Sequence, residues 1–364
     1  MKNAVIIGAG QTGRGLIAPI LKLANIHMTF IDKNKALIDE LVGKSEFCVR
    51  YYSHLHDDVD INSYNAFDIE STDAVNAVAG ADVLFTAVFA QNIKALIPFL
   101  KKSIEIRTKP DRLIIICCEN GINVKQPLID ENINAVISEG IVFCTSVAEK
   151  DNLNIDSEAI LDIPVDNVAG IGGLDISGIN IVDGYSSLIR RKIHTYNYIS
   201  ALISYLGSYK NYSIYADAAN DPDISYALAQ VEPILNRVIA KEYKISEMKA
   251  SEFSARAISK FKNKEIYDTI LRNARQCERK LGLNERMISP LIFAIKFNES
   301  TKYFDIPIAA AIYYGEKNEG LCSKDIIELI SGWIKSDKDI ISIQKYYSMF
   351  KEGIALDIIL SNNN

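Results

Sequence analysis

A glycine-spaced loop near the start of the chain constrains the fold more than any other feature. The apolar run Ala4 to Ile7 leads into this loop, and apolar residues then recur at helical spacing from Leu16 to Ala24. In such a unit the first glycine permits a tight turn, the second lets phosphates approach the backbone, and the third lets the helix pack on the strand. The start of the helix presents unpaired N–H groups to an anion. We therefore expect the loop to hold the pyrophosphate of a dinucleotide, through Gly8, Gly10, Gln11, Thr12 and Gly13.

An acidic residue at the end of the second apolar run indicates which dinucleotide to expect. Asp32 follows the run Met28 to Ile31, about twenty residues after the last glycine of the loop. Its carboxylate would accept hydrogen bonds from the ribose hydroxyls of NAD and would repel the extra phosphate of NADP. A turn without a ligand, or a flavin site, fits this order of strand, loop, helix, strand and acid less well. Lys33 leaves NADP as an alternative.

The first half of the chain alternates short apolar runs with helical patterns, which is typical of β-α-β units and a parallel sheet. We expect an α/β, Rossmann-type doubly wound sheet. From 151 to 183 the pattern gives way to Gly, Asp and Asn with short β-like runs, which we interpret as an irregular extension of the sheet. The expected strands are Ala4 to Ile7, Met28 to Ile31, Val83 to Val88, Leu113 to Cys117 and Ile141 to Cys144.

The second half has helical periodicity almost to its end. Gly207 is expected to stop the first helix, and Pro233 to kink the second or to start a new one. The expected domains are an NAD-binding domain with its β extension at 1–183 and a mostly α-helical substrate and catalytic domain at 184–364. The helical segments are expected at 185–206, 224–242, 247–262, 264–281 and 323–335.

Charge and composition argue against several kinds of partner. The net charge of -6 and the pI near 5.4 disfavour nucleic acid and anionic membranes, which require a basic surface. No apolar run approaches the ~20 residues that span a bilayer, and glycines interrupt the first run before it reaches the length of a signal-peptide core. The six cysteines include no C-x-x-C pair, which suits reduced thiols. We expect a soluble cytoplasmic protein that is a monomer or a weak oligomer and acts on a small molecule.

The histidines do not predict a metal site. His54 and His56 precede two aspartates, but the chain has only 4 histidines and no remote Cys or His partner at metal-site spacing. We expect a solvated loop there and no bound metal.

Several segments, in the same order along nearly the whole chain, resemble one enzyme family. They are Gly8 to Gly15, Cys118-Glu119-Asn120 after a strand, Arg191 to Asn197 at a helix, and 272–281 followed by 285–290. Together they are similar to the mannitol dehydrogenase family of polyol-specific long-chain dehydrogenases, and within it to the mannitol-1-phosphate 5-dehydrogenases. The chain carries Glu149-Lys150 where that family has Asp-Arg, which preserves both charges.

The resemblance implies a metal-independent hydride transfer between NAD and a polyol or its phosphate, with a helix lysine as general base. The family signature is Lys, then Asn five residues on, then His three further; here Lys192 and Asn197 match, and Ser200 replaces the histidine. On one continuous helix, Asn197 and Ser200 would lie about 140° and 80° around the axis from Lys192, so all three could border one cleft. A serine hydroxyl donates a hydrogen bond but is shorter than imidazole and uncharged. Either the substrate sits closer, a water fills the gap, or activity has been lost.

Asn120 and His194 also bear on the predicted catalytic site around Lys192. The resemblance gives Asn120 a role beside Asn197 in stabilising the developing alkoxide, against the alternative of an ordinary turn asparagine. His194 would lie about 200° from Lys192 on a continuous helix, so we interpret it as structural.

Three arginines recur at spacings of three and four. On one helix, Arg272, Arg275 and Arg279 would share a face and could clamp a phosphate. The alternative is a solvated face paired with Glu278 and Glu285.

The resulting functional expectation is an NAD-dependent enzyme that interconverts mannitol 1-phosphate and fructose 6-phosphate, or a close pair of compounds. Two alternatives stay open. One is a dehydrogenase of a non-phosphorylated polyol. The other is a nucleotide-binding regulatory or interaction protein that has lost catalysis, which Ser200 favours and which Lys192 and Asn197 disfavour.

Overall fold

The computed structural model describes residues 1–52 and 56–362. His54, part of the loop considered above as a metal ligand set, lies outside the described residues. The chain forms two compact units, Met1–Ile189 and Arg190–Asn364, and each is described by itself.

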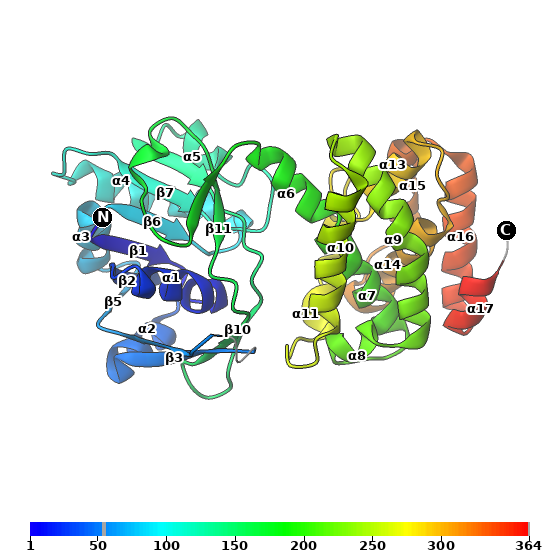
Figure 1. The fold of residues 1–364 in the computed structure, drawn as a ribbon, viewed down its shortest axis with the longest axis horizontal. Coiled ribbons are helices and arrows are strands. Elements are labelled where there is room, and N and C mark those ends of the chain that lie inside the picture. The colour runs from blue at the N-terminus through cyan, green and yellow to red at the C-terminus, as the bar shows by residue number, and fades with distance from the viewer. Residues whose placement is uncertain (53–55, 363–364) are drawn as a thin grey trace. The chain divides into compact units, whose positions relative to one another are not determined.

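A six-stranded parallel sheet forms the centre of the first unit (Figure 1). Its strands lie in the order β5-β2-β1-β6-β7-β8. Because the order runs outward in both directions from β1 and β6, the carboxyl ends of these two strands flank the point where ligands bind in such sheets. The strands are β1 (Asn3–Ile7), β2 (His27–Asp32), β5 (Asn65–Asp68), β6 (Val83–Thr86), β7 (Leu113–Cys117) and β8 (Ala135–Glu139).

The sheet is buried on both faces, as the unbroken apolar strands require. Ala4 and Ile6 of β1 pack into one apolar cluster, while Val5 and Ile7 pack into another on the opposite face. The predicted doubly wound α/β fold is therefore confirmed. The helical segments of this unit are η1 (Gly13–Ile17), α1 (Ala18–Leu23), α2 (Lys35–Lys44), α3 (Thr72–Gly80), η2 (Ala90–Leu96), α4 (Ile97–Glu105), α5 (Gln126–Asp130) and η3 (Ile171–Gly173).

Two smaller sheets correct the sequence-based description of this unit. The strand expected at 141–144 is wrong: β8 lies just before it, and Leu113 of β7 pairs with Ala135. Both segments are apolar and buried, so hydrophobicity alone did not distinguish them. The 151–183 region does not extend the main sheet. It contributes to a four-stranded sheet of β4 (Val59–Asn62), β3 (Glu46–Tyr51), β10 (Ile155–Ser157) and β9 (Ser146–Ala148), and to a pair of β11 (Ile163–Asp166) and β12 (Ile179–Val182).

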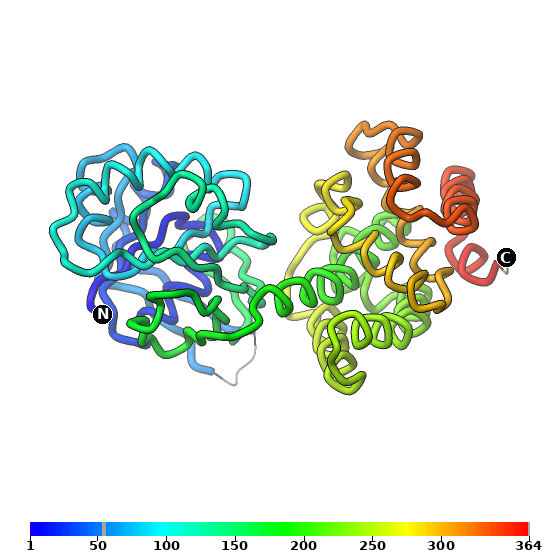
Figure 2. The backbone as a smooth tube through the Cα atoms, turned by 90° about the horizontal axis from the view of Figure 1, so that it is seen from above, coloured from blue at the N-terminus to red at the C-terminus, as the bar shows by residue number. Residues whose placement is uncertain are grey.

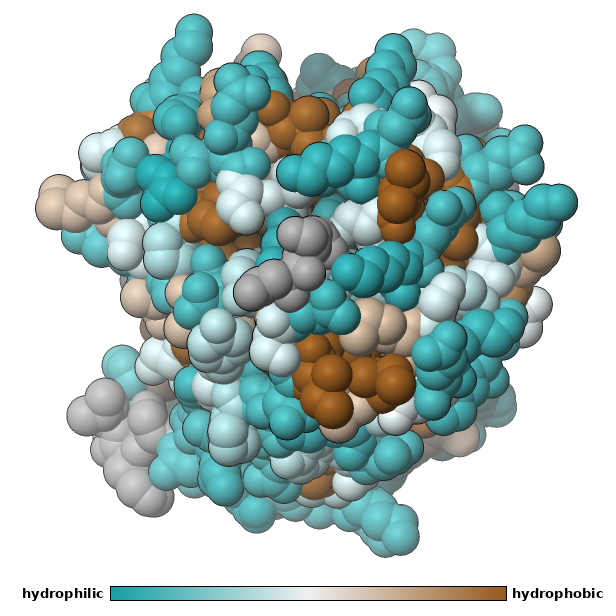
Figure 3. Space-filling model, turned by 90° about the vertical axis from the view of Figure 1, so that its right-hand side faces the viewer, coloured by the Kyte–Doolittle hydropathy of each residue, from teal (hydrophilic) through white to brown (hydrophobic). Residues whose placement is uncertain are grey.

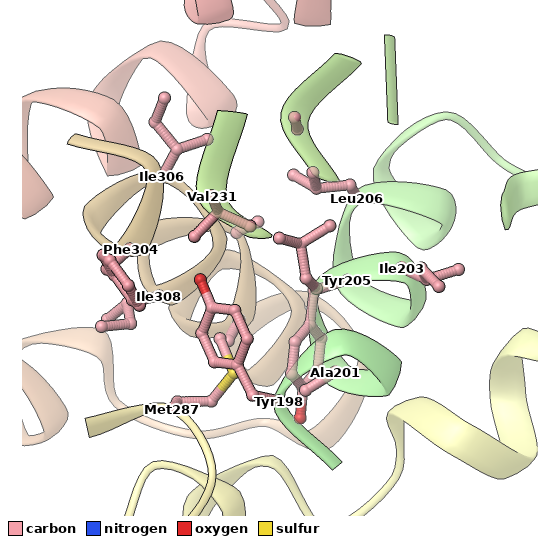
Figure 4. Packing of buried hydrophobic residues seen from close by; sticks show 14 of the residues in the cluster. Tyr198, Ala201, Ile203, Tyr205, Leu206, Val231, Met287, Phe304, Ile306 and Ile308 are labelled. Carbon is pink, nitrogen blue, oxygen red and sulfur yellow. The ribbon is translucent and has the colours of Figure 1, made fainter. Parts of the chain in front are cut away.

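The second unit is helical, as predicted, and the chain enters it along α6 (Tyr185–His194). The backbone trace shows the helices stacked around one another (Figure 2). Its core gathers buried aromatic side chains (Figure 4): the ring of Tyr198 of α7 packs against Phe304 of α14, and that of Tyr205 of α7 against Tyr314 of α14. The remaining helices are α7 (Tyr196–Tyr209), α8 (Tyr215–Ala219), α9 (Pro222–Tyr243), α10 (Glu247–Lys262), α11 (Ile270–Ala274), α12 (Cys277–Lys280), α13 (Ile288–Lys296), α14 (Lys302–Glu319), α15 (Ser323–Ile334), α16 (Asp337–Lys351) and α17 (Leu356–Ser361).

Side-chain caps explain where several helices begin. The Asn34 carboxamide accepts a hydrogen bond from Leu37 N at the start of α2, and the Ser71 hydroxyl accepts one from Ala74 N at the start of α3. Asp221 caps α9 in the same way, and Pro222 fills its first turn. Pro233 lies inside α9, which continues past it as one helix rather than ending there.

Gly207 does not end a helix, contrary to expectation. It lies inside α7, where a Cβ atom would stand 2.7 Å from Ala218 Cβ and 2.9 Å from Ile270 Cδ1. The glycine therefore allows α8 and α11 to approach α7 closely.

We expect Gly207→Ala to lower the free energy of unfolding by about 1–3 kcal/mol, because overpacking outweighs the gain in helix propensity. Gly332→Ala in α15 is the matched control, since nothing lies within 4 Å of its Cβ position. That variant should gain up to ~1 kcal/mol. Urea denaturation measures both, and equal stabilities of the two variants would contradict the packing role.

The surface of the helical unit shown in Figure 3 is mainly hydrophilic, with apolar side chains in separate small groups. Across residues 1–52 and 56–362, no helix has both the length and the apolar character needed to cross a bilayer.

Candidate functional site

The glycine loop after β1 has the backbone that its sequence predicts. Gly8 has φ +104° and donates a hydrogen bond to Ile31 O over 2.8 Å. A Cβ atom on Gly13 would stand 2.1 Å from Gly8 O, so these two positions require glycine. Gly10 differs, because nothing lies within 4 Å of its Cβ position. Space is therefore open at the glycine expected to face the phosphates.

The residues between the last two glycines begin the helix. Thr12 already has helical dihedrals, and η1 follows it directly. The carboxamide of Gln11 lies against β9, oriented to donate to Ser146 O (3.1 Å) and to accept from Ala148 N (3.3 Å). Buried Arg14 donates from Nε to Ala9 O over 2.8 Å. The loop is thus tied to its own helix and to the neighbouring small sheet.

Asp32 lies at the end of β2, directly beside the glycine loop. Its Oδ2 accepts from Ala9 N (2.8 Å) and its Oδ1 accepts from Asn34 N (2.9 Å). These bonds fix the carboxylate at the loop, and each oxygen keeps a lone pair for a ribose hydroxyl. The open position at Gly10 and the fixed carboxylate of Asp32 together fit a dinucleotide.

A buried acid that the sequence reasoning missed lies near the carboxyl ends of β6 and β7. Glu119 is 4% exposed, and its carboxylate accepts from Thr86 Oγ1 (3.0 Å) and from Val88 N (3.1 Å). Burial raises its pKa to about 7. The adjacent Asn120, the predicted alkoxide contact, is exposed. In the sequence, the position of an acidic residue directly after an apolar strand could have identified Glu119 as a candidate.

Lys192 in α6 is a deeply buried lysine of the helical unit. Its side chain is buried, with a residue exposure of 5%. Burial lowers its pKa to about 7, and the charges of Lys260 and Arg286 contribute. A lysine with this pKa is partly neutral near pH 7, as a general base must be.

The chain does not form one helix from Lys192 to Ser200. Thr195, with φ -116° and ψ -72°, separates α6 from α7, so Lys192 lies in the last turn of one helix while Asn197 and Ser200 lie on the next. The angles expected from a continuous helix are therefore wrong. Asn197 and Ser200 are partly exposed and share a face of α7, since they are three residues apart. The backbone oxygen of Ser200 accepts a hydrogen bond from Tyr215 Oη at 3.3 Å.

His194 is a packed residue, as the sequence suggested. Its Nδ1 lies 2.7 Å from Tyr243 Oη, and its ring packs edge-on against Phe293. Burial lowers its pKa to about 4, so the ring is neutral at physiological pH.

The three predicted phosphate-binding arginines do not share one helix. Arg275, with ψ 158°, and Gln276, with φ 62°, separate α11 from α12. The expectation of a single helical face is therefore wrong. Arg272 forms an ion pair with Asp268 (2.8 Å) on the first segment, and Arg279 pairs with Glu285 (2.8 Å) beyond the second.

Two further cations near α12 were missed. Lys280 is 5% exposed; its ammonium donates to Asn273 O and lies 5.8 Å from the ring centroid of Tyr205. Burial, with the charges of Arg286 and Arg279, lowers its pKa to about 7. Arg286 has a side chain only 12% exposed and pairs with Glu285 at 3.1 Å. One carboxylate, Glu285, thus bridges two of these three neighbouring cations.

In the described part of the chain, no three or more His, Cys, Asp or Glu side chains are grouped to hold a metal ion.

The chain resembles known proteins over most of its length. Residues 2–151 match the mannitol dehydrogenase Rossmann domain, and residues 185–328 match the mannitol dehydrogenase C-terminal domain. Mannitol-1-phosphate 5-dehydrogenase of Thermoanaerobacter pseudethanolicus is 27% identical over 341 residues, 88% of this chain and 87% of that protein. The protein of the same name from Aspergillus clavatus is 28% identical over 309 residues, 79% of this chain and 80% of the other.

Solved structures show the same fold. Pseudomonas fluorescens mannitol 2-dehydrogenase, in a ternary complex with NAD and D-mannitol, aligns with a TM-score of 0.74 at 12% identity, over 100% of this chain and 95% of that chain. A D-sorbitol dehydrogenase in substrate-free form aligns with a TM-score of 0.74 at 14% identity, over 96% and 93%. With both domains matched in order and the fold shared, the chain belongs to the mannitol dehydrogenase family.

Proposed function

We propose that this protein is an NAD-dependent polyol-phosphate dehydrogenase that interconverts mannitol 1-phosphate and fructose 6-phosphate, or a close pair of compounds. The observation that carries this proposal is the buried Lys192, whose pKa is lowered to about 7 in the part of the chain that matches the family's C-terminal domain. The two curated relatives are both mannitol-1-phosphate 5-dehydrogenases, which favours a phosphorylated substrate.

The dinucleotide would be held by the glycine loop and by Asp32. The open space at Gly10 would admit the pyrophosphate, Gly8 and Gly13 shape the turn, and Gln11 and Thr12 lie between Gly10 and Gly13. The Asp32 carboxylate favours the free ribose hydroxyls of NAD over the phosphate of NADP. When NAD is bound, its nicotinamide ring would accept the hydride.

In the oxidation direction, Lys192 Nζ takes the proton from the reacting hydroxyl while hydride leaves the same carbon, and the C–O bond becomes a carbonyl. Asn197 and Asn120 donate hydrogen bonds to that oxygen as negative charge develops on it. Ser200 takes the position of the family histidine and would donate from its hydroxyl, directly or through one water.

The substrate phosphate would be held by cations around α12. The proposed phosphate ligands are Arg275 and Arg279, together with Lys280 and Arg286, whose side chains are more deeply buried. Arg272 is also a candidate; it is paired with Asp268, just as Arg279 and Arg286 are each paired with Glu285. Arg286 affects both buried lysines, because its positive charge contributes to the lowered pKa of Lys192 and to that of Lys280.

We expect Lys280→Met to raise KM for mannitol 1-phosphate by roughly tenfold or more, because a charge-assisted hydrogen bond to the phosphate is lost. KM for unphosphorylated mannitol should change little. Lys296→Met is the control, since it removes a lysine that is exposed and paired with Glu242. Steady-state assays on both substrates measure the contrast, and equal KM changes would exclude Lys280 from phosphate binding.

A screen of sugar phosphates and free polyols, followed by NADH absorbance, tests the proposed function directly. Turnover of a polyol phosphate with NAD, and much less with NADP, supports it. Calorimetric NADH binding without turnover of any polyol would favour the nucleotide-binding protein without catalysis, which the absence of the family histidine at Ser200 suggests as a second candidate. Turnover of free polyols alone would place the protein among dehydrogenases of unphosphorylated substrates.

A further inference from the structure

Phe89, directly after β6 and Ala87-Val88, has a backbone conformation that side chains rarely adopt. Its φ is 69° and its ψ is 141°, in a region populated almost only by glycine. The side chain is also 63% exposed, which is unusual for phenylalanine. A bulky residue in a strained conformation persists only where its surroundings hold it, and such residues cluster at ligand sites.

The neighbouring residues hold Phe89 on both sides. Val88 N donates to Glu119 Oε1 (3.1 Å), and Val88 O accepts from Asn92 Nδ2 (2.6 Å). Asn92 N also donates to Phe89 O (2.9 Å). The second oxygen of the buried Glu119 carboxylate is fixed by Thr86 Oγ1 (3.0 Å). The peptide groups flanking Phe89 are therefore fixed by hydrogen bonds to the side chains of Glu119 and Asn92 and to the backbone of Asn92.

The segment that carries Phe89 runs beside the glycine loop. Ala87 N donates to Ile7 O (2.8 Å), and a Cβ atom on Gly8 would stand 2.4 Å from Ala87 O. Within the sheet, β6 lies on one side of β1 and β2 lies on the other, with Asp32 at the end of β2. A dinucleotide whose adenosine ribose is bound at Asp32 and whose pyrophosphate lies on the glycine loop therefore extends its other half toward the end of β6.

We propose that Phe89 is a cofactor contact, whose ring packs against the ribosyl-nicotinamide half of the bound dinucleotide. The proposal rests on the proposed NAD-binding function. Burying the exposed ring of Phe89 against the ligand would contribute favourably to the binding free energy. Because the backbone of Phe89 is already fixed, binding would not carry the entropic cost of ordering it. Glu119 and Asn92 are positioning residues, which act through the backbone of Val88 and Phe89.

The experiment measures binding and thermal stability on the full chain, with three variants and two ligands. Phe89→Gly removes the ring and the strain; Phe89→Ala removes only the ring; Phe89→Tyr keeps an aromatic ring. We expect both Phe89→Gly and Phe89→Ala to weaken NADH binding by roughly fivefold to tenfold in calorimetry, and Phe89→Tyr to retain it. Affinity for ADP, which lacks the ribosyl-nicotinamide half, should stay unchanged. Without ligand, Phe89→Gly alone should raise Tm by roughly 2–6 °C.

The control is Ile106→Ala, which truncates another exposed apolar side chain, after α4 and before the amino end of β7, whereas the glycine loop and Phe89 follow the carboxyl ends of their strands. It should bind NADH like the wild type. Unchanged NADH affinity in Phe89→Gly and Phe89→Ala would overturn the proposal, as would an equal loss of NADH and ADP binding. If the wild-type protein bound neither ligand, the proposed nucleotide-binding function itself would fail.

Discussion

Lys192→Ala is expected to lower kcat for polyol-phosphate oxidation by about 10²–10⁴-fold, the contribution typical of a positioned general base. NADH affinity should stay within about twofold, because the nucleotide-binding residues lie in Met1–Ile189 while Lys192 lies in the second compact unit. Lys192→Arg should be equally inactive, since a guanidinium keeps its proton at every practical pH. Stopped assays and NADH calorimetry measure the two properties separately. Full turnover in Lys192→Ala would exclude this lysine from the reaction.

The pH profile tests the role of Lys192 more closely. A base with a pKa of about 7 must be neutral to act, so kcat/KM for oxidation should rise with pH and level off above about 7. Lys260 contributes to this lowered pKa, so Lys260→Met should move the rising limb toward higher pH while the plateau is retained. A structural lysine would produce no such shift. An unchanged limb in Lys260→Met would contradict the assignment of the limb to Lys192.

The glycine loop could be predicted from sequence because most of its requirements are local. Gly13 is required by its close approach to Gly8 O within one strand, loop and helix, and Gly8 by its positive φ and by Ala87 O after β6. The spacing of the glycines reports the geometry of the loop directly. Asp32 follows a strand whose apolar run is unambiguous. The doubly wound parallel sheet follows from the alternation of strands and helices, which leaves few topologies, although its strands β5 and β8 were not predicted.

The helical half was harder, because single residues decide its geometry. Periodicity identifies the apolar residues across 185–206 and 264–281, yet it does not show that α6 and α7 are separated at Thr195 or that Gln276 adopts the left-handed conformation. A glycine near a helix end can either terminate the helix or allow another helix to pack closely against it. Only the atoms around Gly207 in the folded structure distinguish these two roles. Burial of Lys280 likewise depends on long-range packing that no local pattern reports.

A buried pair of carboxyl groups in the helical unit should make its stability depend on pH. Asp305 of α14 is 1% exposed and Asp339 of α16 is 4% exposed; one oxygen of each has no hydrogen-bond partner in the described structure. Burial raises the pKa of Asp305 from 3.8 to about 8, and the charge of Asp339 adds to the effect, while Ser342 and Lys338 oppose it. The folded protein therefore holds a proton that the unfolded chain releases near pH 4.

Because the folded state binds more protons between these two pKa values, stability from this group is greatest below about pH 4 and falls as pH rises toward 8. The free energy of unfolding from this group falls by at most about 1.4 kcal/mol per pH unit, and it stops falling above the pKa of Asp305 in the folded protein. Asp305→Asn mimics the protonated acid, so its advantage over the wild type should grow from pH 5 to pH 8. Urea midpoints across that range measure it. Glu328→Gln, which neutralises an exposed acid on α15, should leave the wild-type slope unchanged. A parallel slope in Asp305→Asn would contradict the assignment of this pH dependence to Asp305.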